Sequence, residues 1–188
     1  VSRFHHAFGR LISLSIATWI PTMTNIGTTT ELAIVTGMLE LLECACAEVT
    51  VNGQGEPCFC GIYPGSNVSW DYCGECSRGK CGMVYLQPGR TFPYTVFPQQ
   101  ELDDRCTLPL GFEIELGVVR CMPTISEDGD LPDPADITAA ALGLIADQYA
   151  LYSAIKCCET SLKSLVIERW TPVGPQGGCV AGSWTLYV

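Results

Sequence analysis

Histidine is almost absent from this chain: the two histidines are His5 and His6, and residues 7 to 188 contain none. Serine and cysteine nucleophiles usually need a neighbouring base, and that base is most often histidine. Histidine-bearing zinc sites and the two-histidine iron triad need this residue as well. We therefore expect no enzyme, and the sequence offers no catalytic residue and no cofactor-binding residue.

Basic residues are also scarce, because 10 Lys+Arg stand against 20 Asp+Glu and the formal net charge is -10. A chain with this charge repels phosphate backbones and has no basic stripe that could release counterions from DNA. We expect no sequence-specific nucleic-acid partner.

Long apolar runs are missing too. The nearest candidate, Leu11 to Ile20, contains three hydroxyl residues and falls short of the roughly 18 to 20 apolar residues that span a bilayer. The run follows a basic stretch, as in a signal peptide, but no small-x-small cleavage site comes after it. Met23 is an alternative natural start. We expect no membrane partner, an N-terminal extension over 1–28 that is peripheral, and a single domain over 29–188.

Two segments have the residue spacing of amphipathic helices. Thr28 and Glu31 form a capping box, and apolar residues then recur at spacings of three and four over 29–49. Asp133 and Pro134 are typical of a helix start and predict a helix over 134–158. The face predicted to pack on a sheet consists of Ile137, Ala141, Leu144, Leu151, Ile155 and Cys158.

Strand composition recurs between and after these helices. The clearest strand covers 112–121, where Phe112, Ile114, Leu116 and Val118 alternate with glutamates. The other expected strands cover 83–86, 92–97, 164–170 and 180–187, with a Pro- and Gly-rich turn over 171–178. The order predicts an α+β fold: a mainly antiparallel sheet with two main helices packed on one face.

Cysteine is abundant, with 12 residues. The segment 52–80 is predicted to be an irregular Cys-rich loop insertion that is cross-linked or holds a metal ion. The cysteines of this segment, with the one that follows it, could bind a structural zinc ion, form disulfides or stay as reduced thiols. The sequence does not distinguish among these three states. The cysteines concerned are Cys58, Cys60, Cys73, Cys76 and Cys81.

The remaining cysteines include two close pairs. Cys44 and Cys46 are two residues apart on a helix and therefore point to different faces, so we expect them not to share a partner. Cys157 and Cys158 are adjacent. At least one of them is expected to be buried as a small apolar residue or to pair with a distant cysteine such as Cys121 or Cys179.

Two further patterns imitate functional motifs. Gly74 to Cys81 matches the first seven positions of a phosphate-binding loop, but a cysteine stands where magnesium needs Ser or Thr, and no helix is expected next. The acids Asp103/Asp104 and Glu127/Asp128/Asp130 lack the regular oxygen spacing of a calcium-binding loop. We interpret the first as a turn and the acids as solvated loop charge.

The C-terminal half carries a resemblance to a known group of proteins. The segments concerned are Leu116-Gly-Val-Val-Arg-Cys-Met-Pro123, the acidic Pro-rich loop after it, Ala146-Asp147, and Trp170 to Trp184. They resemble head-to-tail connection proteins of long-tailed actinobacteriophages, and within that group the tail terminators. The resemblance covers roughly residues 30 to 188, where Cys81-Gly82, Phe92-Pro93 and Phe97-Pro98 also fit.

The resemblance implies a structural virion protein rather than an enzyme. Tail terminators are small α+β proteins that form a ring, typically a hexamer, which caps the tail tube and docks onto the head. The implied partners are other copies of the chain, the tail tube protein and the head-side connector protein. The implied location is the neck of a virion assembled in the host cytoplasm.

Stopping a polymer requires surfaces rather than catalytic groups. The candidate contact surfaces are the aromatic C-terminal hairpin, with Trp170, Trp184 and Tyr187, and the edge from Phe92 to Phe97. Acidic loops lining the ring would discourage passing DNA from sticking, a hypothesis that a basic lumen would contradict.

Other functions are compatible with the same residues. The chain could be another neck protein, a stopper or an adaptor. It could also be a secreted disulfide-rich binding module with a leader over 1–22, which predicts a processed N-terminus and a monomer. A zinc-ribbon adaptor centred on Cys58 to Cys81 is the third possibility, which metal analysis under reducing conditions would detect.

Overall fold

The computed structural model describes residues 29–65, 67–69, 82–101, 108–126, 128–176 and 178–188. The chain divides into two compact units, 1–32 and 33–188. Of the first unit, the described part is the beginning of a helix. The features predicted within 1–28, the glycine-rich segment 74–81 and the acids Asp103 and Asp104 lie outside the described residues.

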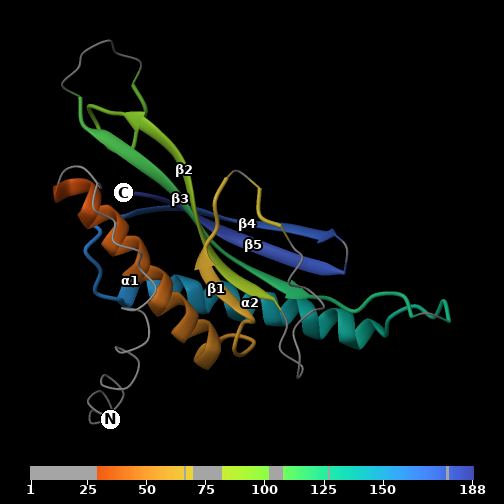
Figure 1. The fold of residues 1–188 in the computed structure, drawn as a ribbon. Coiled ribbons are helices and arrows are strands. Elements are labelled where there is room, and N and C mark those ends of the chain that lie inside the picture. Colours follow the sequence, from red (N-terminus) through yellow and green to blue (C-terminus); the bar gives the residue numbers. More distant parts are fainter. Residues whose placement is uncertain (1–28, 66, 70–81, 102–107, 127, 177) are drawn as a thin grey trace, which may run out of the picture. The chain divides into compact units, whose positions relative to one another are not determined.

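The described residues form an α+β fold with a five-stranded sheet, as predicted. The strand order is β1-β2-β3-β5-β4; β1 pairs with β2 in parallel, and the other neighbours are antiparallel. In chain order the elements are α1 (Thr29–Asn52), β1 (Phe59–Ile62), β2 (Met83–Pro93), β3 (Leu110–Cys121), α2 (Pro134–Cys157), β4 (Val166–Gln176) and β5 (Cys179–Tyr187) (Figure 1).

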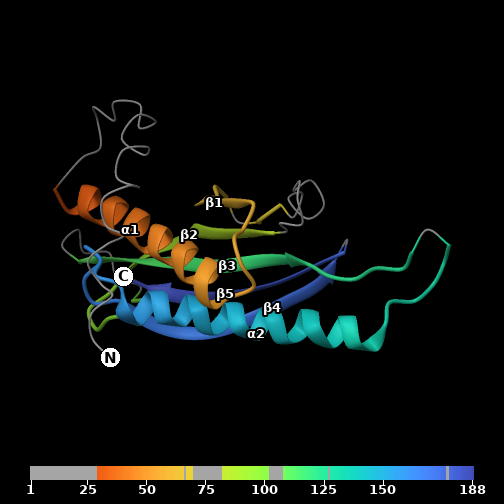
Figure 2. The same ribbon diagram turned by 90° about the horizontal axis from the view of Figure 1, so that it is seen from below.

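Both helices pack on the same face of the sheet, which confirms the predicted arrangement (Figure 2). The predicted alternation on β3 holds, since Ile114, Leu116 and Val118 point into this core. The neighbouring strands contribute Val84, Leu86 and Leu186, while the helices contribute Leu41, Leu42, Val49, Leu144, Leu151 and Ile155.

The opposite face of the sheet has a second, smaller core. Met83, Tyr85 and Val119 are buried there with residues of β5, and Phe59, Tyr63 and Val68 cover them. Part of the Cys-rich segment therefore covers this smaller core. Because both faces are covered here, β3 is buried without interruption from Leu116 to Arg120.

Helix α2 begins as predicted. The side chain of Asp133 accepts a hydrogen bond from the Ala135 amide at 2.8 Å, which caps the helix. The predicted core stripe is wrong in its first half, because Ile137 and Ala141 are exposed. Periodicity predicts which residues share a face, but burial also depends on where neighbouring elements lie, and the buried positions of α2 begin at Leu144.

The expected strands over 83–86 and 92–97 are in fact one strand, β2, that ends at Pro93. A register shift between Pro88 and Thr91 accommodates the interior proline and glycine. β1 pairs with Met83 to Leu86 alone, so Pro88 lies in a part of β2 where its missing N–H breaks no hydrogen bond to β1.

The turn expected over 171–178 is wrong for its first six residues, because β4 continues through Gln176. β4 is the last strand of the sheet, so Pro172 and Pro175 can lie in it, and the register shifts between Val173 and Gln176. The Cys-rich segment likewise contains a strand, β1, which we did not place from sequence.

Candidate interaction surface

The outer face of α2 carries a row of exposed apolar side chains. Leu142, Ile145, Tyr149 and Tyr152 follow one another at spacings of three and four, so they form one stripe along the helix. Their exposed fractions are 62%, 48%, 69% and 40%. We call these four residues the α2 stripe. Together they expose on the order of 400 Å² of largely apolar surface, more than scattered surface residues provide.

Charge is absent from the same surface. The charged residues of α2 are Asp136 near its start, Asp147 in its middle and Lys156 in its last turn. Asp147 is fully buried, so no charged side chain is exposed between the other two. A helix that is apolar on all sides is normally covered on all sides. None of the helices in the described part of the chain combines the length and apolarity needed to cross a bilayer.

A buried ion pair fixes α2 against β3. Arg120 Nε and Nη2 donate to the two carboxylate oxygens of Asp147 at 2.8 and 3.0 Å. The network extends to the turn after α1, since the backbone N–H of Gln54 donates to Asp147 and Arg120 donates to the backbone carbonyl of Gly55. No buried side-chain polar atom lacks a partner in the described part of the chain. Asp147 lies on the same side of α2 as the buried Leu144, Leu151 and Ile155, so the ion pair and the apolar core together keep the opposite side facing outward.

Two of the aromatic residues predicted in the C-terminal hairpin, Trp170 and Trp184, lie beside the α2 stripe, whereas Tyr187 lies on the other face of the sheet. Trp184 Nε1 donates to the Gln148 carbonyl at 3.2 Å, and its ring lies 5.5 Å from that of Tyr152 and 5.6 Å from that of Trp170. The two tryptophans are half-buried, and they extend the apolar surface of Tyr152 toward the edge strand. Phe92, which we expected in a contact edge, is buried in the core and contacts Tyr187 edge to face.

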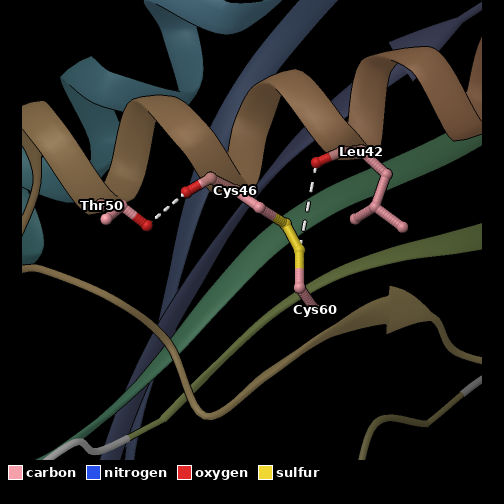
Figure 3. The surroundings of a disulfide bond; sticks show 4 residues. All are labelled: Leu42, Cys46, Thr50 and Cys60. Atoms are coloured by element: carbon pink, nitrogen blue, oxygen red, sulfur yellow. Dashed lines mark hydrogen bonds between the residues drawn. A yellow bond between two sulfur atoms is a disulfide. The ribbon is translucent and has the colours of Figure 1, made fainter. Parts of the chain in front are cut away.

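Disulfides hold α1 from two sides. Cys46 bonds to Cys60 of β1, with Cα atoms 6.3 Å apart (Figure 3). Thr50 Oγ1 donates to the Cys46 carbonyl at 2.7 Å one turn further along the helix. Cys58 is disulfide-bonded as well. Both sulfurs of the Cys58-x-Cys60 pair are therefore engaged, which leaves neither as a thiolate ligand for zinc.

The second disulfide joins α1 to the end of α2, with Cys44 bonded to Cys158. Cys44 and Cys46 thus have different partners, as predicted. Cys158 pairs with a distant cysteine, as predicted, but the partner is Cys44 rather than Cys121 or Cys179, which are themselves disulfide-bonded; Cys157 is free and exposed. Spacing along the chain cannot reveal that Cys44 lies beside the end of α2, because the tertiary packing of the two helices brings them together.

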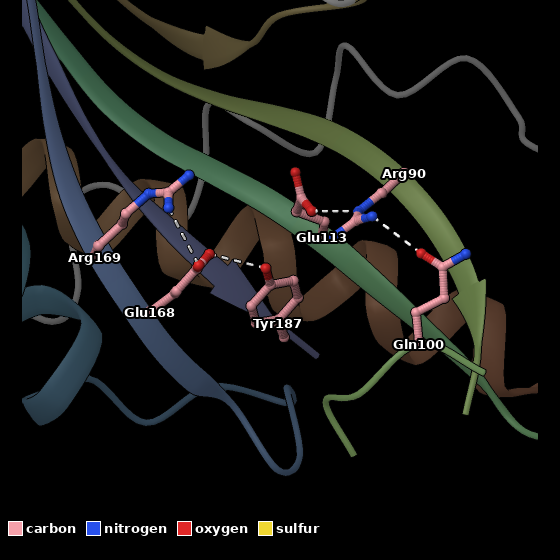
Figure 4. A network of polar contacts seen from close by, with 6 residues as sticks. All are labelled: Arg90, Gln100, Glu113, Glu168, Arg169 and Tyr187. Carbon is pink, nitrogen blue, oxygen red and sulfur yellow. Dashed lines mark hydrogen bonds and ion pairs between the residues drawn. The ribbon is translucent and has the colours of Figure 1, made fainter. Parts of the chain in front are cut away.

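A network of polar side chains lies on the sheet's second face, beyond the part of β2 that pairs with β1 (Figure 4). Arg90 Nε donates to Glu113 at 2.7 Å and Arg90 Nη1 to Gln100 at 3.0 Å, while Tyr187 donates to Glu168 at 2.8 Å. Glu168 also lies 3.5 Å from Arg169. These groups are largely solvated and mutually paired, so they have the character of a surface network rather than of a catalytic centre.

Two ionisable groups beside this network are perturbed. Burial, with the nearby charge of Glu115, raises the pKa of Tyr85 to about 12. Partial burial, with the nearby charge of Glu113, raises the pKa of Glu115 above its usual range. In the described part of the chain no group of three or more His, Cys, Asp or Glu is placed to hold a metal ion.

The connection between β3 and α2 is an arm, residues 122–126 and 128–133, that extends away from the sheet (Figure 2). It has its own hydrogen bonds: Gly129 donates to the Ser126 carbonyl, and Ser126 and Asp130 exchange two further bonds. Ile125 and Leu131 of the arm are exposed to 61% and 79%.

Three of the four segments that carry the resemblance meet at α2: Arg120 binds Asp147, and Trp184 binds the backbone at Gln148. Sequence reasoning identified these segments but neither the ion pair nor the α2 stripe; the charge-free run from Ile137 to Ile155, interrupted only by Asp147, was the available signal for the stripe. No protein-family model matches this chain, and comparison with curated proteins finds no match either.

Proposed function

We propose that this chain is a structural protein of the head-to-tail connection of a long-tailed phage, and specifically a tail terminator. Copies of the chain form a ring, with six as the expected number, on the end of the tail tube. The ring joins the tail tube protein to a head-side connector protein in the neck of the virion. The proposal assigns the chain no catalytic reaction.

The observation that carries the proposal is the α2 stripe. A second apolar face on a helix that already packs on its own sheet has no function in a lone subunit, and exposing it to water is unfavourable. Interfaces between permanent subunits resemble a protein core cut in half, and homo-oligomer interfaces are more apolar than most. The stripe, with its two tyrosines and no charge, has that composition.

The resemblance in the C-terminal half supports a phage connector over an unspecified oligomer. Its segments supply the ion pair and the tryptophan contact that orient α2, so the residues behind the resemblance also position the proposed contact surface. An α+β protein with a mainly antiparallel sheet is also what the resemblance implies.

The native mass of the purified protein tests the proposal. Light scattering at several concentrations, on chains that begin at Val1 and at Met23, is expected to give a discrete oligomer with the mass of six copies. Electron microscopy is expected to show rings, and addition of tail tubes is expected to place them at one tube end. A monomer at every concentration, with or without tubes, would contradict the proposal.

The disulfides favour one alternative function. Cys44–Cys158 and Cys46–Cys60 are the kind of cross-link that persists in an oxidising compartment, as in a secreted binding module. That alternative predicts a monomer whose N-terminus is processed after export. Mass spectrometry of protein isolated from its natural source distinguishes the two, because an assembled neck protein would be recovered with virions.

A further inference from the structure

The arm and the α2 stripe are both exposed, and they differ in chemistry. The arm presents Ile125 and Leu131 among acids, of which Asp128, Asp130 and Asp133 are exposed. The stripe presents apolar side chains with no exposed acid among them, and the helix that carries it ends near Lys156. An acidic apolar arm is repelled by most of a chain with a net charge of -10, but not by this face.

The two features are separated along the molecule. The arm leads into Pro134, whereas the stripe begins at Leu142, about 12 Å further along the helix axis. The arm extends away from the sheet (Figure 2), and its apolar side chains Ile125 and Leu131 are exposed, as are the four residues of the stripe. The arm's hydrogen bonds at Ser126 hold it in shape before any partner binds.

We propose that in the ring the arm of one copy packs on the α2 stripe of the next copy, with Ile125 and Leu131 against Ile145 and Tyr149. The arm's acids then lie toward Lys156 of that neighbour. This inference rests on the proposed function and identifies the contact between subunits. Because the two surfaces differ, the contact is heterologous, and its repetition gives a ring where the rotation closes, as the proposed function requires, rather than an isologous pair.

Three substitutions that place the same charge on an exposed apolar residue test this contact. Tyr149→Asp alters the stripe, Leu131→Asp alters the arm, and Val51→Asp is the matched control, since Val51 is 78% exposed and lies on neither surface. We expect the first two to raise the concentration needed for assembly at least tenfold and to give monomers where the wild type is a ring. The control should remain a ring. All three should unfold at the wild-type temperature when compared as monomers at low concentration.

A mixing experiment tests that the two surfaces meet each other. The Tyr149→Asp copy keeps an intact arm and the Leu131→Asp copy keeps an intact stripe, so an equimolar mixture should form a species of two copies that neither variant forms alone. Absence of that species would overturn the inference, because it would show that each surface contacts something else.

The remaining outcomes separate this inference from the proposed function. If the wild type is a ring and both variants remain rings at wild-type concentrations, the arm contact is wrong and the ring proposal stands. If the wild type is a monomer throughout, with or without tail tubes, both fail. Lys156→Glu should weaken assembly more than Lys156→Gln, and equal effects would contradict the proposed position of the arm's acids.

Discussion

At the scale of single residues, Arg120 and Asp147 make the most consequential contact in the core. Both side chains are almost fully buried, and two backbone groups after α1 complete their hydrogen bonds. Removing one partner of such a pair leaves a charge buried without compensation, which costs more than the pair contributes. The pair connects β3, α2 and the turn after α1.

We therefore predict that Asp147→Ala lowers the free energy of unfolding by about 3 to 5 kcal/mol. Glu113→Ala is the control, because its partner Arg90 has a side chain that is 58% exposed and the loss should be below about 1 kcal/mol. Urea denaturation at one protein concentration measures both. If both variants lost the same small amount of unfolding free energy, the ion pair between Arg120 and Asp147 would not be formed in solution.

Glu115 makes stability depend on pH. Partial burial raises its pKa, so the folded state holds this proton more tightly than the unfolded chain does. The stability that it contributes is fully present below the ordinary carboxyl pKa of about 4.3 and is lost as the pH rises through the raised value.

Glu115→Gln should therefore stabilise the protein at pH 7 and have no effect near pH 4. Glu43→Gln, at an exposed site on α1, removes the same charge and serves as the control for net charge. Denaturation midpoints at the two pH values check the prediction. An advantage of the same size at both pH values would contradict it.

At the scale of secondary-structure elements, α1 depends on cross-links. Cys44 joins it to the end of α2, Cys46 joins it to β1, and Glu40 accepts a hydrogen bond from the Ser161 amide. The two disulfides close segments of very different length, with sequence separations of 114 and 14. A longer closed segment restricts the unfolded chain more.

The paired change Cys44→Ser with Cys158→Ser should therefore cost about 4 to 5 kcal/mol of stability, and Cys46→Ser with Cys60→Ser about 3 kcal/mol. Cys157→Ser, at the free thiol, should stay within about 0.5 kcal/mol of the wild type. Guanidinium denaturation without reductant ranks the three. Peptide mapping without reduction should recover both predicted links, and a different pairing would refute the assignment.

At the scale of the whole molecule, charge governs which partners can approach. With a net charge of -10 the chain should not retard duplex DNA in a gel, even at low salt of about 50 mM. Retardation that disappears as salt is raised would reveal a basic surface and would also contradict the hypothesis of an acidic ring lumen. A basic control protein of similar size confirms that the assay detects binding.

Much of the fold was predictable because its signals are local. The Asp133 cap and Pro134 specify the start of α2 through short-range geometry, and the alternation over Phe112 to Val118 specifies a strand with one buried face. Strand ends next to proline were not predictable in this way. Whether a proline interrupts a strand depends on whether its missing N–H faces a neighbour or an open edge, as on β4.

The sequence by itself determined the fold class, the acidic character, the lack of histidine in the main body and the charge-free run of α2, since each follows from residue identity and spacing. Tertiary structure alone decided that Cys44 meets Cys158, that Arg120 meets Asp147, and that Ile137 is exposed where Leu144 is buried. These contacts join residues far apart in the chain. Their formation depends on how the two helices pack on the sheet, and no local sequence pattern specifies that packing.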